Sequence, residues 1–369
     1  MRLPADLRPA DGRFGSGPSK VRPAAVEALA ASASSYLGTS HRQEPVRAVV
    51  RRLRQGLAEL FALPEGYEVA LGNGGAACFW DIATFWLIER RSQHLVFGQF
   101  SSTFSKIAAA APHLEEPEVI TSEYGAHPDP RPSAGVDLYA LTHNETSTGV
   151  AMEVRRPEGA GGALVAVDAT SAAGGMLVDP AHFDAYYFAP QKCFASDGGL
   201  WVALLSPAAL DRCARLVAEG RWSPAILSLP AALEQSRLNQ TYNTPALATL
   251  ALFADQLEWM LGNGGLKWAA DRSAASTSTV YEWAERSSYA RPFVADPAHR
   301  SPVVATVDID DGVDATVVSK VLRANGIVDT DSYRGLKRNQ LRIACYPAVD
   351  PEDVAVLVGA IDYVVGAMP

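Results

Sequence analysis

Cysteine is scarce in this chain of 369 residues, and basic residues do not outnumber acidic ones. The four cysteines, at positions 78, 193, 213 and 345, are far apart and form no CxxC pair, so neither a disulfide framework nor a structural zinc site is expected. Lysine and arginine number 32 against 41 aspartates and glutamates, which gives a formal net charge of −9. Because nucleic-acid-binding surfaces are normally basic, we expect no nucleic-acid partner. The one basic cluster, 47–54, has apolar residues at helical spacing and is interpreted as a solvated helix face.

Long hydrophobic runs are also missing. No stretch approaches the roughly 20 apolar residues that span a bilayer. The N-terminus, MRLPADLRPADGRFGSGPS, has prolines and charges where a signal peptide needs an apolar core. The sequence therefore predicts a cytoplasmic protein without a membrane partner.

Short apolar runs alternate with amphipathic segments over most of the chain. Strand-like runs lie at 67–71, 94–97, 136–141, 163–167, 185–189 and 200–205, and helical patterns lie at 22–34, at 45–61 and from about 76. Strands separated by helices predict an α/β fold with βαβ units on a mainly parallel sheet.

The pattern changes after about residue 260. A helix at 267–286 precedes SPVVATVDI, a helix that ends at ANG, the runs IVDT and LRIACY, and a last helix from 350. This order predicts a smaller α/β domain with an antiparallel sheet in which IVDT is a strand. We place the large domain at 17–262 and the small domain at 263–369, together with the N-terminal segment 1–16.

Two ionisable residues follow apolar strands near the middle of the chain. Asp168 ends ALVAVD, and Lys192 follows YYFAPQ. Neighbouring parallel strands would bring both to the carboxyl edge of the sheet, where such folds bind ligands. Pyridoxal phosphate would satisfy both charges, because its aldehyde forms a Schiff base with a lysine amine and its ring nitrogen pairs with a carboxylate. The alternative, that Asp168 caps a helix and Lys192 is a surface lysine, is favoured for either residue alone but not for the pair.

A phosphate group would need a cradle, and the cofactor ring would need a face to stack on. The glycine-rich turn that ends at Gly75 is followed by Ala76 and Ala77 at a predicted strand-to-helix junction, where free N–H groups attract anions. Phe100 follows another strand end and is a candidate stacking platform. A plain tight turn and a core aromatic remain the alternatives.

Polar residues at two further positions could serve the same ligand. Thr146 in HNETSTG could hydrogen-bond the ring oxygen or the phosphate, whereas Asn144 and Glu145 could simply shape the turn. Asn243 and Thr244 precede the proline that begins a long helix, where such residues are typical caps. In a dimer they could also reach the phosphate of a neighbouring subunit.

Seven short motifs occur along the chain in this order: FGSGPS, GTSHR, LGNGGA, HNETSTG, DATS, APQK and YNTPA. Together they resemble the motifs of the phosphoserine aminotransferase family. That family belongs to the class V aminotransferases and to the fold-type I enzymes that use pyridoxal phosphate. The resemblance extends from about Phe14 to the last helix, and the ordered set is highly specific. It implies a large domain with a mainly parallel seven-stranded sheet between helices, a smaller C-terminal α/β domain, and a homodimer with shared active sites.

The resemblance also implies a role for each matching residue. Lys192 resembles the Schiff-base lysine, Asp168 the partner of the ring nitrogen, and Arg342 the arginine that binds the α-carboxylate. The cofactor-binding positions it implies are Gly75, Ala76, Ala77, Phe100, Thr146, Asp168, Gln191 and Lys192, with Asn243 and Thr244 from the other subunit. Ser16, His41 and Arg42 lie in segments that line the substrate pocket of the family.

The chain departs from the family pattern at three places. Many members have an arginine at the position of Ala77 and a tryptophan at the position of Phe100. The C-terminal His-Arg pair of many members has no clean match, and Arg334, Lys337 and Arg338 are nearby cations that could replace it. The group that binds the substrate phosphate is therefore left open.

The implied reaction is a reversible ping-pong transfer of an amino group between glutamate and 3-phosphohydroxypyruvate, which gives O-phosphoserine and 2-oxoglutarate in serine biosynthesis. The sequence leaves open whether 4-phosphohydroxythreonine of pyridoxine biosynthesis is also a substrate. The alternatives are other class V enzymes, namely an alanine/serine–glyoxylate aminotransferase or a cysteine desulfurase. A desulfurase needs a mobile nucleophilic cysteine, and Cys345 lies in a predicted strand. A pyridoxal-phosphate-binding regulator would carry a basic DNA-binding segment, and none is visible.

Overall fold

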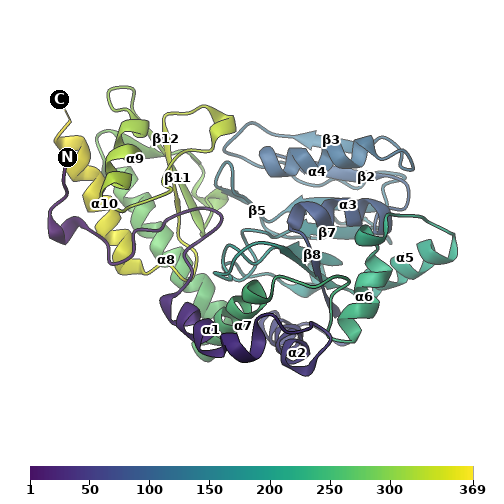
Figure 1. Ribbon diagram of the computed structural model, residues 1–369. Coiled ribbons are helices and arrows are strands. Elements are labelled where there is room, and N and C mark those ends of the chain that lie inside the picture. The colour runs from purple at the N-terminus through teal and green to yellow at the C-terminus, as the bar shows by residue number, and fades with distance from the viewer. Residues whose placement is uncertain (369) are drawn as a thin grey trace.

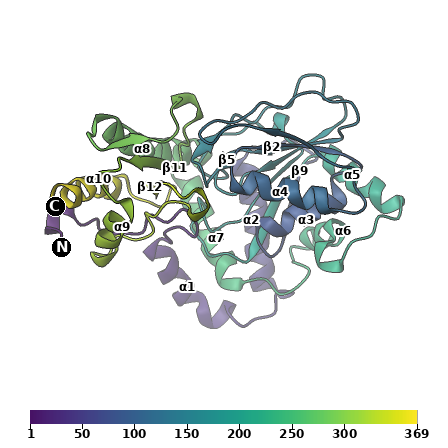
Figure 2. The same ribbon diagram turned by 90° about the horizontal axis from the view of Figure 1, so that it is seen from above.

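The computed structural model describes residues 1–368, and Figures 1 and 2 show two layered α/β units side by side. Within these residues the larger sheet has seven strands, in the order β1-β9-β8-β7-β4-β2-β3. Their bounds are β1 (Glu68–Asn73), β2 (Ser92–Val96), β3 (Glu118–Thr121), β4 (Leu138–Thr142), β7 (Leu164–Asp168), β8 (Ala185–Phe188) and β9 (Leu200–Leu205). Strand β9 pairs antiparallel with both neighbours, and β3, β2, β4, β7 and β8 pair parallel. The predicted α/β fold with a mainly parallel seven-stranded sheet is confirmed.

Helices cover both faces of this sheet. One face packs on α3 (Ala76–Trp86), α4 (Gln99–Ala110), α5 (Pro207–Ala218) and α6 (Leu229–Arg237), and the other on α2 (Glu44–Leu60) and α7 (Leu247–Gly262). Helix α1 (Pro23–Tyr36) lies beside α7. Because both faces are covered, every residue of β4, β7, β8 and β9 is buried, which explains the continuous apolar runs in their sequences.

Strand β3 is an edge strand that the sequence did not reveal. Its residues, EVIT, alternate between half-buried and exposed, so they lack the continuous apolar run of the central strands. The helices of residues 1–368 include none that is long and apolar enough to cross a membrane.

The smaller unit is a three-stranded antiparallel sheet in the order β10-β11-β12, with bounds Ala290–Pro292, Val304–Ile309 and Gln340–Ala344. Helices α8 (Gly265–Arg286), α9 (Ala315–Ala324) and α10 (Pro351–Gly366) pack on it. The prediction that IVDT is a strand of this sheet is wrong. Residues 327–330 make one isolated bridge, between Val328 and Arg13, and the third strand is β10.

The N-terminal segment lies against the smaller unit, and both ends of the described chain meet there (Figure 1). Leu3 and Phe14 belong to the same apolar cluster as β11, β12 and α10. Lys20 is buried and pairs with Asp350 at 2.7 Å, directly before α10. The chain then continues to α1 on the larger unit. The exact domain boundaries stay a prediction.

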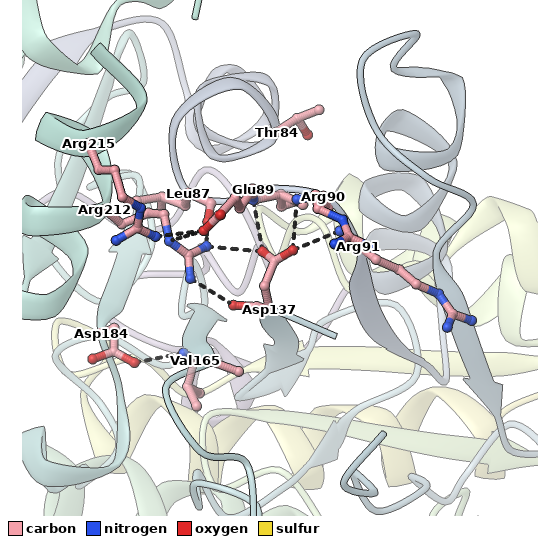
Figure 3. Close-up of polar contacts among 12 residues, drawn as sticks. Thr84, Leu87, Glu89, Arg90, Arg91, Asp137, Val165, Asp184, Arg212 and Arg215 are labelled. Atoms are coloured by element: carbon pink, nitrogen blue, oxygen red, sulfur yellow. Dashed lines mark hydrogen bonds and ion pairs between the residues drawn. The ribbon is translucent and has the colours of Figure 1, made fainter. Parts of the chain in front are cut away.

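A polar cluster fixes the amino ends of the central strands (Figure 3). The carboxylate of Asp137, just before β4, accepts hydrogen bonds from the backbone N–H groups of Glu89, Arg90 and Arg91 at 2.7–2.8 Å. Arg212 of α5 donates to the same carboxylate at 3.0 Å and to the Leu87 carbonyl at 2.7 Å. These bonds hold β2 and β4 together at their amino ends, opposite the carboxyl ends at which the site described next is built.

Candidate active site

A cavity of about 660 Å³ lies at the carboxyl edge of the larger sheet. Its walls are built by the segments that follow β1, β2, β4, β7 and β8, which is where parallel strands present their ends to a ligand. The remaining wall comes from residues 16–18, from the 332–335 loop and from Arg342 on β12. Eleven of the sequence-predicted residues line this one cavity: Ser16, Gly75, Ala76, Ala77, Phe100, Thr146, Asp168, Gln191, Lys192, Arg334 and Arg342.

Lys192 is buried on the cavity wall. Its Nζ donates a hydrogen bond to Oγ1 of Thr146 at 3.0 Å. Burial lowers the pKa of this amine to about 8, although the nearby Asp168 charge acts in the opposite direction. The N-terminal segment passes against the side chain. A Cβ at Gly17 would stand 2.9 Å from the Cε of Lys192, and Gly17 has a φ of +143°, so glycine is required there for two independent reasons.

Asp168 is the last residue of β7, and three donors orient its carboxylate. Nε1 of Trp80 donates to Oδ2 at 2.9 Å. The backbone N–H and the hydroxyl of Thr170 donate to Oδ1 at 2.9 and 2.7 Å. Trp80 belongs to α3 and stacks on Phe104 of α4, so two helices fix the indole that holds this carboxylate.

The turn between β1 and α3 is open toward the cavity. Gly75 is the residue that caps α3, and a Cβ there would meet nothing within 4 Å. Ala76 and Ala77 begin the helix, and no side chain caps it by a hydrogen bond, so its first N–H groups are left for another acceptor. Such a helix start attracts an anion through its free N–H groups and its dipole.

The residues after β4 divide between the cavity and the scaffold. Thr146 faces the cavity and bonds Ser171 at 2.8 Å as well as Lys192. Glu145 is fully buried, and its carboxylate accepts from the backbone N–H groups of Phe100 and Ser101 at the start of α4, at 3.1 and 2.9 Å. Glu145 thus sets the position of Phe100, whose ring centre lies 5.3 Å from Nζ of Lys192.

Arg342 brings a second, half-buried cation to the cavity. It lies on β12, and its Nη1 donates to the Thr146 carbonyl at 3.2 Å. Its guanidinium carbon lies 5.3 Å from the ring centre of Tyr333. Burial lowers the pKa of this guanidinium. Its Nε is buried and without a hydrogen-bond partner among residues 1–368.

Several buried polar atoms of the cavity residues share this lack of a partner. In the described part of the chain, Oγ of Ser16, Oδ1 of Asn144, Oε1 of Gln191 and Nε of Arg342 are buried and unbonded. A buried polar atom without a partner is costly, and a polar ligand relieves that cost. With an anion cradle, a carboxylate and an amine around the same space, the residues present fit pyridoxal phosphate and a second, carboxylate-bearing molecule.

Six candidate residues do not line the cavity, namely His41, Arg42, Asn243, Thr244, Lys337 and Arg338. Arg338 is paired with Asp308 at 2.5 Å and lies over the ring of Phe293. His41, Arg42, Asn243 and Thr244 lie apart, where Nδ1 of His41 and the Thr244 hydroxyl are 3.1 Å from each other. The side chain of Asn73, at the end of β1, joins this group to the phosphate turn through the backbone of Asn243 and Thr244, at 3.2 and 3.0 Å.

The cavity residues that the sequence missed include Trp80, Gln99, Thr170 and Tyr333. Thr170 could have been found, because an aspartate side chain in a turn typically accepts a hydrogen bond from the backbone N–H two residues on. Trp80 lies in an apolar helix, and nothing in its spacing distinguishes it from a core residue.

Comparisons with known proteins agree with this geometry. The family model for aminotransferase class V matches residues 132–332, which is more than half of the chain. A phosphoserine aminotransferase of Nocardioides sp. is 60% identical over 367 residues, which is 99% of this chain and 98% of that protein. A phosphoserine aminotransferase of Rhodococcus jostii is 58% identical over 366 residues, which is 99% of this chain and 98% of that protein. Among solved structures, a phosphoserine aminotransferase from Cytophaga hutchinsonii superposes with a TM-score of 0.89 at 25% identity, covering 96% of this chain and all of that one.

The fold and the site therefore define a class V aminotransferase. The full-length identities narrow this further. The chain belongs to the phosphoserine aminotransferase family.

Proposed function

We propose that the chain catalyses the reversible transfer of an amino group between glutamate and 3-phosphohydroxypyruvate, giving O-phosphoserine and 2-oxoglutarate, with pyridoxal phosphate bound in this cavity. The observation that carries the proposal is the set of charges around one space. The buried cation Lys192, the half-buried cation Arg342 and the buried carboxylate Asp168 line the same 660 Å³ cavity. A family whose members are phosphoserine aminotransferases by name supplies the substrate class.

When bound, pyridoxal phosphate supplies an electron-withdrawing ring that stabilises negative charge at the substrate α-carbon. Asp168 would hold the ring nitrogen in its protonated form, and Trp80 and Thr170 keep its carboxylate aimed into the cavity. The first N–H groups of α3, at Ala76 and Ala77, would hold the phosphate.

Other cavity residues would complete the cofactor site. The unbonded Oε1 of Gln191 lies beside Lys192 in the chain, within reach of the same ligand. The ring of Phe100 would cover one face of the cofactor. The hydroxyl of Thr146, which Lys192 contacts here, would hydrogen-bond the ring oxygen of the cofactor.

Lys192 would carry the proton of the reaction. With a pKa lowered to about 8, a substantial fraction of this amine is neutral near pH 8. A neutral Nζ would accept the proton of the substrate α-carbon and would then donate it to the carbon on the other side of the transferred nitrogen. The bond from Nζ to Thr146 sets where the amine rests, and Gly17 leaves room for its methylenes to move.

Arg342 would bind the α-carboxylate, which both substrates share. A guanidinium binds a carboxylate through two parallel N–H···O bonds, and the Nε of Arg342 is available for one of them. For the distal phosphate or carboxylate we propose Arg334 and Ser16, which line the cavity. Arg338 is engaged by Asp308 and is left out of this assignment.

We further propose a homodimer in which His41, Arg42, Asn243 and Thr244 serve the partner's active site. Three features support it. Asn243 and Thr244 are exposed, they lie outside the cavity of their own chain, and the neighbouring Tyr242 exposes 41% of its surface. Nε2 of His41 is also without a partner in residues 1–368. A cytoplasmic location stays a prediction from the sequence.

The test of this activity is a donor competition. Purified protein with pyridoxal phosphate and 2-oxoglutarate is given phosphoserine, alanine, aspartate or cysteine, and glutamate is measured. We expect phosphoserine to be the preferred donor. A preference for alanine or aspartate would contradict the proposed substrate, and sulfide release from cysteine would indicate a desulfurase. The buried Cys345, with its pKa raised by burial, argues against the last outcome.

A further inference from the structure

Two aromatic rings in the cavity each lie against a cation, one against the buried Lys192 and the other against the half-buried Arg342. Nζ of Lys192 is 5.3 Å from the ring centre of Phe100, and the guanidinium carbon of Arg342 is 5.3 Å from the ring centre of Tyr333. The two rings contact each other, with centres 5.9 Å apart and planes at 63°. Lys192, Phe100, Tyr333 and Arg342 therefore form a continuous row of contacts, and all four line the cavity.

The row connects the two sheets of the molecule. Phe100 is the second residue of α4, which follows β2 of the larger sheet. Tyr333 belongs to the loop that leads into β12 of the smaller sheet, and Arg342 lies on β12 itself. The contact between Phe100 and Tyr333 therefore joins a helix of the larger unit to a loop of the smaller unit within the lining of the cavity.

Hydrogen bonds leave the guanidinium of Arg342 incompletely held. Its Nη1 donates to the Thr146 carbonyl, and its Nε has no partner among the described residues. A half-buried cation with a buried, unbonded Nε gains from a compensating contact, and the face of an aromatic ring within about 6 Å supplies one. The backbone of Gly335 also lies beside this ring, where an added Cβ would be 3.0 Å from Cε1 of Tyr333.

We propose that Tyr333 is a positioning residue of the reaction. The face of its ring holds the guanidinium of Arg342 where the substrate α-carboxylate binds, and its edge contact braces Phe100 over the cofactor. The inference rests on the proposed function, because it takes Arg342 as the α-carboxylate ligand. It adds a residue that acts through Arg342 and that forms no bond to substrate in this role.

The chemistry of the two contacts decides which substitution is informative. Both need an aromatic ring, and neither uses the hydroxyl group. Tyr333→Phe keeps the ring, whereas Tyr333→Leu keeps comparable bulk but loses the π face. Tyr124, which is 58% exposed and does not line the cavity, gives a matched control as Tyr124→Leu.

The experiment uses the protein loaded with pyridoxal phosphate. We expect Tyr333→Leu to raise KM for phosphoserine and for glutamate by about tenfold each, with kcat changed less than about threefold. Calorimetry with 3-phosphoglycerate, which carries a carboxylate and a phosphate but has no group to transfer, should show a similar tenfold rise in Kd. Tyr333→Phe and Tyr124→Leu should stay within about twofold of wild type in every quantity.

A double-mutant cycle tests whether Tyr333 acts through Arg342. In the Arg342→Ala background, Tyr333→Leu should add less than about twofold to the Kd of 3-phosphoglycerate, because the group that it positions is gone. A full tenfold increment in that background, or equal loss in Tyr333→Phe and Tyr333→Leu, overturns the positioning role alone. If Arg342→Ala itself leaves that Kd unchanged, the α-carboxylate assignment fails, and the role of Tyr333 fails with it.

Discussion

Replacing Lys192 with methionine should make the cofactor-free protein more stable. Methionine keeps the length of the side chain but removes a charge that is buried with the pKa lowered from 10.5 to about 8. A displacement of this size corresponds to about 3 kcal/mol of folding free energy that wild type loses by burying the ammonium. The lost bond to Thr146 offsets about 1 kcal/mol, so we expect a net gain of about 2 kcal/mol at pH 7.

The pH dependence gives this prediction its sign. Because the pKa of Lys192 is lower in the folded protein than in the unfolded chain, the unfolded chain binds more protons between about pH 8 and pH 10.5. Wild type therefore gains stability as the pH rises through that window, and the penalty is fully present below pH 8. The advantage of Lys192→Met should be largest at pH 7, and above about pH 10.5, where only the lost bond to Thr146 counts, wild type should be the more stable protein by about 1 kcal/mol.

Urea denaturation of both proteins, prepared without pyridoxal phosphate, at pH 7 and at pH 10 measures this difference. Lys20→Met is the matched control. Lys20 is as buried as Lys192 but is paired with Asp350, so its loss should destabilise the protein. The reasoning is refuted if Lys192→Met is less stable than wild type at pH 7, or if the gap between the two proteins is the same at both pH values.

Three further substitutions test individual contacts. Trp80→Phe keeps the stacking on α4 but removes the N–H that donates to Asp168. It should weaken pyridoxal phosphate binding about tenfold in a fluorescence titration. An unchanged affinity would show that the indole N–H is dispensable. Gly17→Ala should lower kcat about tenfold or more, because its Cβ would meet the side chain of Lys192; a kcat equal to wild type would contradict the proposed path of the lysine. Arg334→Ala should raise KM for phosphoserine about tenfold and KM for glutamate less, because the phosphate carries more charge than the carboxylate. An equal rise in both KM values would contradict the assignment of Arg334 to the distal anion.

The carboxyl-edge part of the site was predictable because strand ends are local features of a sequence. Asp168 and Lys192 each follow a continuous apolar run, and parallel pairing of β7 with β8 brings those ends together. The helix start after Gly75 follows from the same local reasoning. The six strands with clear apolar runs were found close to their observed bounds, whereas the half-exposed edge strand β3 was not.

Long-range contacts are what the sequence could not show. Trp80 reaches Asp168 from a helix 88 positions earlier in the chain, and Tyr333 meets Phe100 from the other sheet. Arg338 carried the same charge signal as Arg334, but Asp308 on the neighbouring strand β11 binds it. Likewise, IVDT is β-branched and apolar, yet residues 327–330 make only a single bridge, to the N-terminal segment at Arg13. In each case a partner distant in sequence decides the outcome, and no local pattern encodes it.

Reduction with borohydride after mixing the protein with pyridoxal phosphate, followed by peptide mass mapping, tests the central claim most directly. The account predicts a pyridoxyl group on Lys192, with the labelling reduced when Asp168 is replaced by alanine. A label on any other lysine, or no label at all, would contradict it.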